Sequence, residues 1–194
     1  MSRSLRPGKA ISLVELIISI ALLALVITGF FGIEVFSRYH LITADRRAKL
    51  QNEASYLVAH MSKHLLVAMG DFEHDAVART ASGTGFYIDA FIDDDADGIR
   101  SATAASRIRY CYQSGDCGMA SQDYTVFFRA GTNPGELIVR RIKHFNVSLD
   151  ETENNLLAVN LTACWDPSRA DCGTSDNPSV SIQTKIRMPS VSVN

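Results

Sequence analysis

A single carboxylate, Glu15, lies near the start of an apolar stretch that runs from Ile11 to Ile33. A short basic segment, MSRSLRPGKA, comes before this stretch, and no charged side chain occurs between Leu16 and Ile33. An ionisable group at membrane depth is costly, so it normally has a function or a partner. We expect Glu15 to meet a terminal amine rather than to take part in transport or catalysis.

An acidic turn contains the second candidate site. Asp93, Asp95 and Asp97 precede a glycine in the order D-x-D-x-D-G, which is how a calcium-binding loop begins. The match then stops, because Ala104 stands where a bidentate glutamate would close the loop. Two interpretations stay open: a calcium site completed by Asp89 or backbone carbonyls, and a solvated acidic turn, which we favour.

The four cysteines all lie in the C-terminal half of the chain, where Cys111 and Cys117, and Cys164 and Cys172, are separated by turn-forming residues. Four cysteines allow three pairings, of which two local bridges are the simplest. Each bridge would stabilise the fold by about 2–3 kcal/mol through loop entropy. A zinc site would need tighter C-x2-C pairs.

A pair of histidines and a cluster of basic residues are both interpreted as surface features and not as binding sites. His60 and His64 are one helical turn apart, but the glutamate of the H-E-x-x-H motif is absent, so we expect a surface pair. A small basic patch, expected to be a solvated strand edge, contains Arg140, Arg141, Lys143 and His144. No G-x-S-x-G motif or phosphate-binding loop occurs. We therefore predict no enzyme, and no cofactor apart from the calcium alternative.

The N-terminal residues form a candidate membrane anchor. Leu16–Ile33 is long enough to cross most of a hydrocarbon core of about 30 Å. Arg3, Arg6 and Lys9 favour a cytoplasmic head. A secretory signal peptide would have a shorter apolar region followed by a small-residue cleavage site. Such a site does not follow Ile33, so we expect the segment to be retained.

An amphipathic helix continues from the anchor, because residues 34–69 lack proline and carry one apolar face. We expect the whole helix to run from about residue 12 to residue 69, with Gly70 as its stop. The apolar face consists of Leu50, Ala54, Leu57, Met61, Leu65 and Ala68.

Strands follow the helix, which predicts an α+β fold with an antiparallel sheet against the amphipathic half-helix. Residues 71–106 are loop-rich, with one candidate strand at 85–91. The other predicted strands are 108–112, 124–129, 136–141, 145–149, 156–163 and 179–188.

The segment ISLVELIISIALLALV resembles the N-terminus of type IV prepilins. In that family a basic leader and a cleavage point precede an apolar residue, a small polar one, two aliphatics, a glutamate and a long apolar run. Those places are filled in order by Ile11, Ser12, Leu13, Val14 and Glu15. Further along the chain, the order RAKLQNEASYLVAHMSKHL, then the Asp-rich turn, then RIRYCY looks similar to minor pilins of the PilW kind and to J-type minor pseudopilins of type II secretion.

The resemblance implies a pilin-like organisation. Residues 1–10 would be the leader, 11–33 the transmembrane and filament-core helix, 34–70 its amphipathic half and 71–194 a loop-rich β domain. Cleavage between Ala10 and Ile11 puts Glu15 fifth in the mature chain, as the family has it. The family leader normally ends in glycine, so cleavage after Gly8 stays open as the less favoured register.

The resemblance also implies a function. An inner-membrane prepilin peptidase would remove the leader and methylate Ile11, and an assembly platform would pack the subunit with other pilins through Glu15. The mature domain would be extracytoplasmic, first at the bacterial inner membrane and then in a filament. We expect a minor pilus subunit. A type II secretion pseudopilin and a non-polymerising, membrane-anchored binding module are the alternatives.

Composition gives little support for nucleic-acid binding. The whole chain has a net charge of −2. Removing the first ten residues leaves 16 basic and 21 acidic side chains, a net charge of −5. A protein of this charge lacks the positive field that attracts a phosphate backbone.

Overall fold

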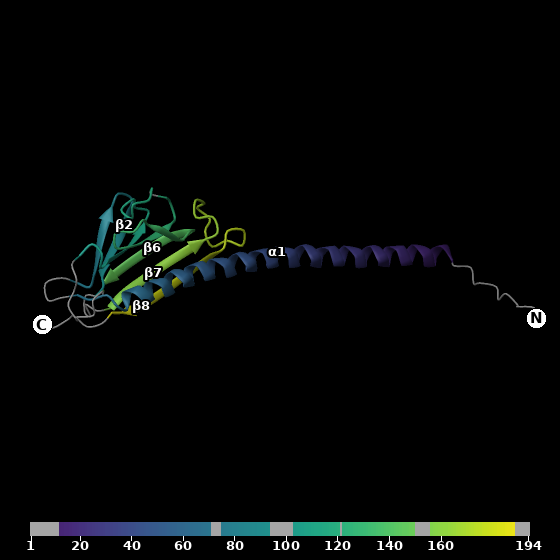
Figure 1. Cartoon of the computed structure of the whole chain (residues 1–194). Helices are drawn as coiled ribbons and strands as arrows, with labels where there is room; N and C mark the ends of the chain where they lie inside the picture. Colours follow the sequence, from purple (N-terminus) through teal and green to yellow (C-terminus); the bar gives the residue numbers. More distant parts are fainter. Residues whose placement is uncertain (1–11, 71–74, 94–102, 121, 150–155, 189–194) are drawn as a thin grey trace, which may run out of the picture. The chain divides into compact units, whose positions relative to one another are not determined.

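The computed structural model describes residues 12–70, 75–93, 103–120, 122–149 and 156–188. Within them the chain forms one long helix and eight strands (Figure 1). Two compact units divide the chain, residues 1–44 and residues 45–194.

Helix α1 (Leu13–Leu65) belongs to both units, with the boundary between Ala44 and Asp45. It ends before the predicted stop near residue 69. The amides of Val67 and Ala68 donate to carbonyls three residues back, which tightens the last turn. Ala68 then forms a β-bridge with Ile92, so the chain has left the helix before it reaches Gly70.

A five-stranded antiparallel sheet follows the helix, in the order β1-β2-β3-β4-β5. Its strands are β1 (Val77–Ser82), β2 (Gly85–Phe91), β3 (Arg107–Tyr112), β4 (Val126–Ala130) and β5 (Glu136–Val139). Sequence analysis missed β1, which has little apolar alternation because Val77 is its one buried residue. The predicted strand at 85–91 is present as β2.

A second sheet has three antiparallel strands, β6 (Ile142–Leu149), β7 (Leu156–Cys164) and β8 (Ser179–Arg187), in that order. We expected one sheet, but β5 and β6 belong to different sheets. The chain turns between them at Arg141, which has a φ of 64°. This left-handed backbone breaks the extended run that the sequence indicates at 136–141.

One hydrophobic core joins the second half of α1 to both sheets. Figure 1 shows this part of the helix running along the strands of the C-terminal unit. The predicted apolar face is confirmed, since all six of its residues are 0% exposed. Alternate residues of β2, β3, β6 and β7 complete the core, as expected for sheets with one face buried.

Candidate functional site

The first turn of α1 holds Glu15. The amide of Glu15 donates to Ser12 Oγ at 3.2 Å, so Ser12 acts as the N-cap of the helix. Ser and Glu three residues apart at a helix start are the residue types of a capping box. A carboxylate in this turn also interacts favourably with the helix dipole. The structure therefore gives Glu15 a local role in addition to the one predicted for assembly.

The surface of α1 after Glu15 is apolar on all sides. The exposed fraction of its large apolar residues between Leu13 and Phe36 runs from 45% at Ile27 to 75% at Leu13. This helix is long and apolar enough to cross a membrane by length and composition, and its most apolar window is not buried within the protein. So large an exposed patch normally marks a contact with lipid or with another protein.

Polar groups inside the apolar segment are satisfied by the helix itself. Ser19 Oγ donates to the carbonyl of Glu15 and Thr28 Oγ1 donates to the carbonyl of Ala24, each at 2.8 Å. These bonds within one helix are the pattern that an apolar environment requires. The segment thus presents no unsatisfied hydroxyl to its surroundings.

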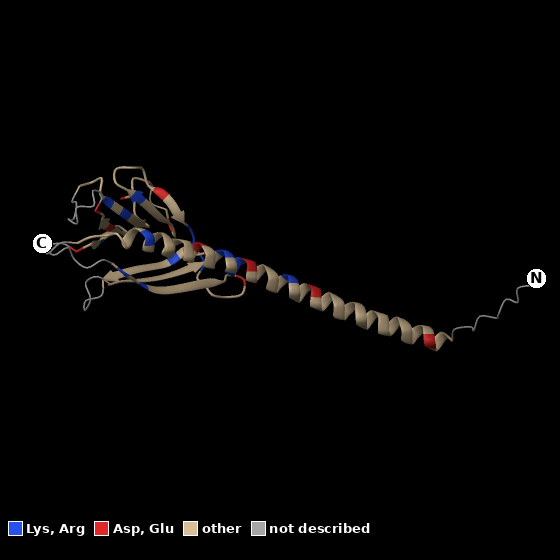
Figure 2. Ribbon diagram, turned by 60° about the horizontal axis from the view of Figure 1, so that its bottom comes forward, with Lys and Arg blue, Asp and Glu red and all other residues tan. Residues whose placement is uncertain are grey.

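Charged residues return at the end of the apolar segment. Arg38 donates to Glu34 at 2.6 Å, and Lys49 lies 2.8 Å from Asp45, both one helical turn apart. Figure 2 shows the contrast, with a long tan stretch of α1, which carries no Lys, Arg, Asp or Glu, between the red residue at its start and these charges. The apolar segment of the helix therefore lies between charged residues, Glu15 at its start and Glu34 and Arg38 at its end.

The predicted processing residues Gly8, Ala10 and Ile11 lie outside the described part of the chain. Of the acidic turn, Asp95 and Asp97 also lie outside it, and Asp93 is the last described residue before that gap. Among the described residues, no group of three or more His, Cys, Asp or Glu side chains gathers as a metal site would. The calcium alternative stays a prediction.

The predicted surface pair of histidines is partly buried, because one side of it packs against the five-stranded sheet. His60 Nδ1 lies 2.9 Å from the hydroxyl of Tyr110. The rings of His60 and His64 each lie 4.8 Å from that of Phe128. Burial lowers the pKa of both histidines, and burial also raises the pKa of Tyr110. This cluster joins α1 to β3 and β4.

Both disulfides are local, linking Cys111 to Cys117 and Cys164 to Cys172. The first lies on the face of the five-stranded sheet that points away from the helix, where both of its cysteines and Phe127 are buried.

On the same sheet, Arg109 holds Asp89 through two hydrogen bonds of 2.6 and 2.7 Å, which raises the pKa of Arg109. Asp89 is thus paired with arginine.

Two residues of the basic patch, Arg141 and Lys143, make contacts within the fold. Arg141 donates to Glu53 of α1 at 2.8 Å and stacks over Trp165 at 4.4 Å. Lys143 donates to the carbonyls of Pro167 and Arg169. Arg140 and His144 are exposed, so the predicted solvated patch holds for these two residues, whereas Arg141 and Lys143 are partly buried by contacts within the fold.

Sequence reasoning missed two features. The Ser12 cap could have been found from its spacing to Glu15. The cavity next to β6, described below, depends on cross-strand register and on the approach of two sheets, which no local pattern reports. No protein-family model, curated protein or solved structure matches the chain.

Proposed function

We infer that the chain is a minor structural subunit of a type IV pilus-like filament, built by packing of the N-terminal helices. The observation that carries this proposal is the exposed apolar segment of α1, with a carboxylate in its first turn and 18 uncharged residues after it. An ordinary anchor needs the apolar length but has no need of the acid.

Packing of such helices would bury Glu15 and would require a cation beside it. Removal of the leader creates that cation at the amine of Ile11. Two such charges 4 Å apart attract by about 4 kcal/mol at an effective dielectric of about 20. Either charge left alone in an apolar bundle would be strongly unfavourable. The pair would therefore fix the axial register of neighbouring subunits.

Stabilisation of the helix start, where Ser12 is the N-cap, is a second explanation for the glutamate at position 15. The two explanations predict that different variants will fail to enter filaments. Gln is also a capping-box residue, so Glu15→Gln keeps the cap but removes the charge. Ser12→Ala removes the cap and keeps the charge, which costs about 1 kcal/mol of helix stability. The matched pair thus separates ionic pairing from local helix stability.

The test is to express each variant in the native cell and measure its level in the membrane and in sheared filaments. We expect Glu15→Gln to reach the membrane at the normal level and to be at least tenfold depleted from filaments. Ser12→Ala should enter filaments at close to the normal level.

Other outcomes point elsewhere. Normal incorporation of Glu15→Gln would rule out the ionic pairing and leave the acid only its favourable position in the first turn of the helix. Absence of the unaltered chain from any filament would favour the non-polymerising anchored module. Its recovery with the secretion machinery rather than with pili would favour the pseudopilin.

A further inference from the structure

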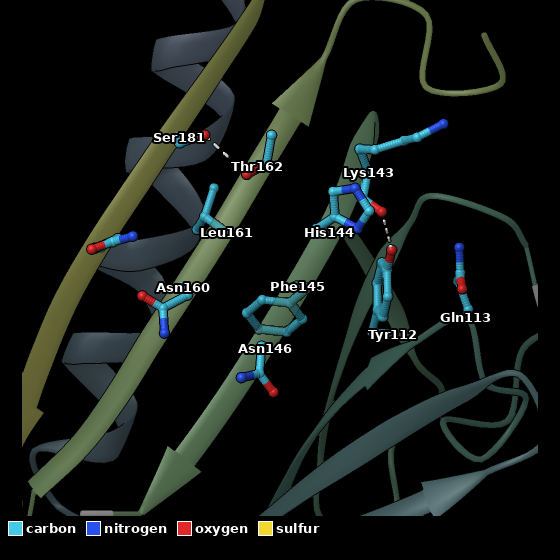
Figure 3. A pocket seen from close by; sticks show the side chains of 11 residues that line it. Tyr112, Gln113, Lys143, His144, Phe145, Asn146, Asn160, Leu161, Thr162 and Ser181 are labelled. Carbon is cyan, nitrogen blue, oxygen red and sulfur yellow. Dashed lines mark hydrogen bonds between the residues drawn. The ribbon is translucent and has the colours of Figure 1, made fainter. Parts of the chain in front are cut away.

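A cavity of about 450 Å³ lies where the end of β3 meets the edge of β6, and it extends over the outward face of the three-stranded sheet (Figure 3). Its size falls within the range of about 300–1,000 Å³ that small-molecule sites occupy. Nothing in the filament proposal uses this surface, which belongs to the C-terminal unit alone.

Two cross-strand rows of polar side chains line the cavity. Strand register places Thr162 between His144 and Ser181, and Asn160 between Asn146 and Gln183. Side chains that are neighbours across antiparallel strands have Cβ atoms about 4.5–5.5 Å apart. The rows therefore form a compact grid of hydroxyl, imidazole and carboxamide groups on one face.

The lining of this grid is almost free of charge. Among the described residues that line the cavity, Lys143 is the one with a Lys, Arg, Asp or Glu side chain. Its ammonium is already bonded to the carbonyls of Pro167 and Arg169. Lys185 and Arg187 lie further along β8, outside the lining. Because 21% of the chain is charged, an uncharged grid of this extent favours an uncharged ligand.

The carboxamides of the second row have unused hydrogen-bonding capacity. In the part of the chain that the structure describes, the side chains of Asn146, Asn160 and Gln183 make no hydrogen bond, whereas Thr162 and Ser181 bond to each other at 2.9 Å. Each carboxamide offers two donor hydrogens and an acceptor oxygen. The row can therefore donate to and accept from the same ligand.

Three residues of the protein core lie beneath the grid, on the buried side of the strands. Tyr112, Phe145 and Leu161 are at most 7% exposed, and the rings of Tyr112 and Phe145 lie 5.7 Å apart. The Tyr112 hydroxyl donates to the carbonyls of β6, at 2.9 Å for Lys143, as drawn in Figure 3. Burial raises the pKa of Tyr112 to about 12, so this donor stays protonated. The strands that carry the grid are therefore held in place before a ligand binds, which lowers the cost of ordering a site.

We propose that this cavity binds a neutral oligosaccharide. A sugar carries hydroxyls that both donate and accept, and it has no charge. A charged ligand would lose its hydration without meeting an opposite charge. The carboxamide row matches the hydroxyl edge of the sugar.

The test is calorimetric titration of the full-length chain in a zwitterionic detergent, chosen because its headgroup is not a sugar. The probes are cellotriose, maltotriose and chitotriose. We expect saturable binding of at least one of them. Loss of two hydrogen bonds in Asn146→Ala/Asn160→Ala should weaken that binding about tenfold or more.

Ser148→Ala is the matched control, because Ser148 is exposed on the same face of β6 and does not line the cavity. It should bind within twofold of the unaltered chain, and all variants should keep the unaltered unfolding temperature. Failure of all three sugars to bind, or equal binding by the double variant, would overturn the proposal. Binding of an Asn/Gln-rich peptide in place of the sugars would do so as well. None of these outcomes depends on filament assembly.

Discussion

At the residue scale, His60 and His64 make the stability of the helix–sheet contact dependent on pH. Burial against Phe128 and Tyr110 lowers the pKa of both rings. For His60 the charge of Glu136 opposes this and that of Lys63 adds to it, while for His64 the added charges are His60 and Lys63. The folded chain therefore binds protons less readily than the unfolded chain, whose histidines titrate near pH 6.5.

The direction in which stability changes with pH follows from the linkage between folding and proton binding. Stability is fully present above pH about 6.5 and falls as the pH decreases toward the lowered pKa values of the folded state. We predict a lower unfolding temperature at pH 5.5 than at pH 7.5, measured by circular dichroism on the full-length chain. His60→Gln/His64→Gln should reduce this pH dependence, whereas His40→Gln, at an exposed histidine of the N-terminal unit, should not. An unchanged pH dependence in the double variant would contradict the prediction.

At the scale of elements, the buried face of α1 packs in the hydrophobic core that both sheets share. Leu57 is 0% exposed at the centre of this face, while Ser55 beside it is exposed. We predict that Leu57→Ala costs about 3 kcal/mol, from lost apolar burial and the cavity left behind. Ser55→Ala should change stability by less than about 0.5 kcal/mol. Denaturant unfolding followed by Trp165 fluorescence measures both, and equal effects would show that the helix is not a core element.

The two disulfides should differ in accessibility. Cys111, Cys117 and Cys164 are 0% exposed, but Cys172 is partly exposed in the loop before β8. We predict that mild thiol reductant under native conditions opens Cys164–Cys172 first, because attack on a disulfide sulfur requires access to it. Alkylation followed by mass spectrometry reports the order. Simultaneous opening of both bridges would mean that reduction follows global unfolding.

The elements differ in how well the sequence predicts them, for physical reasons. The buried face of α1 was predictable because its period of three and four residues is a local property. Strand β1 was not, since only Val77 of its residues is buried. The division into two sheets was not predictable either, because strands of both sheets alternate in the same way and the left-handed Arg141 has no sequence signature. To predict the cavity site from the sequence, the register of the three strands β6, β7 and β8 would have had to be known.

At the scale of the whole molecule, the proposed function depends on a processed N-terminus. We predict that mass spectrometry of the chain from its native membrane finds residues 1–10 removed and a methyl group on Ile11. The physical reason is that an amine is needed within reach of Glu15 of a neighbouring subunit. Ala10→Gly is the matched control, since it restores the residue that usually ends such leaders and should leave the cleavage position unchanged. An intact Met1, or cleavage after Gly8, would contradict the predicted register.

Helix α1 continues without interruption from the apolar segment to the buried face that ends at Leu65. A pull on the N-terminal end of α1 would therefore reach Leu50, Ala54, Leu57, Met61 and Leu65 through the helical backbone. These five side chains would have to slide past the strands together before the domain could give way. In the proposed filament, tension on the helix would therefore act directly on the hydrophobic core of the C-terminal unit.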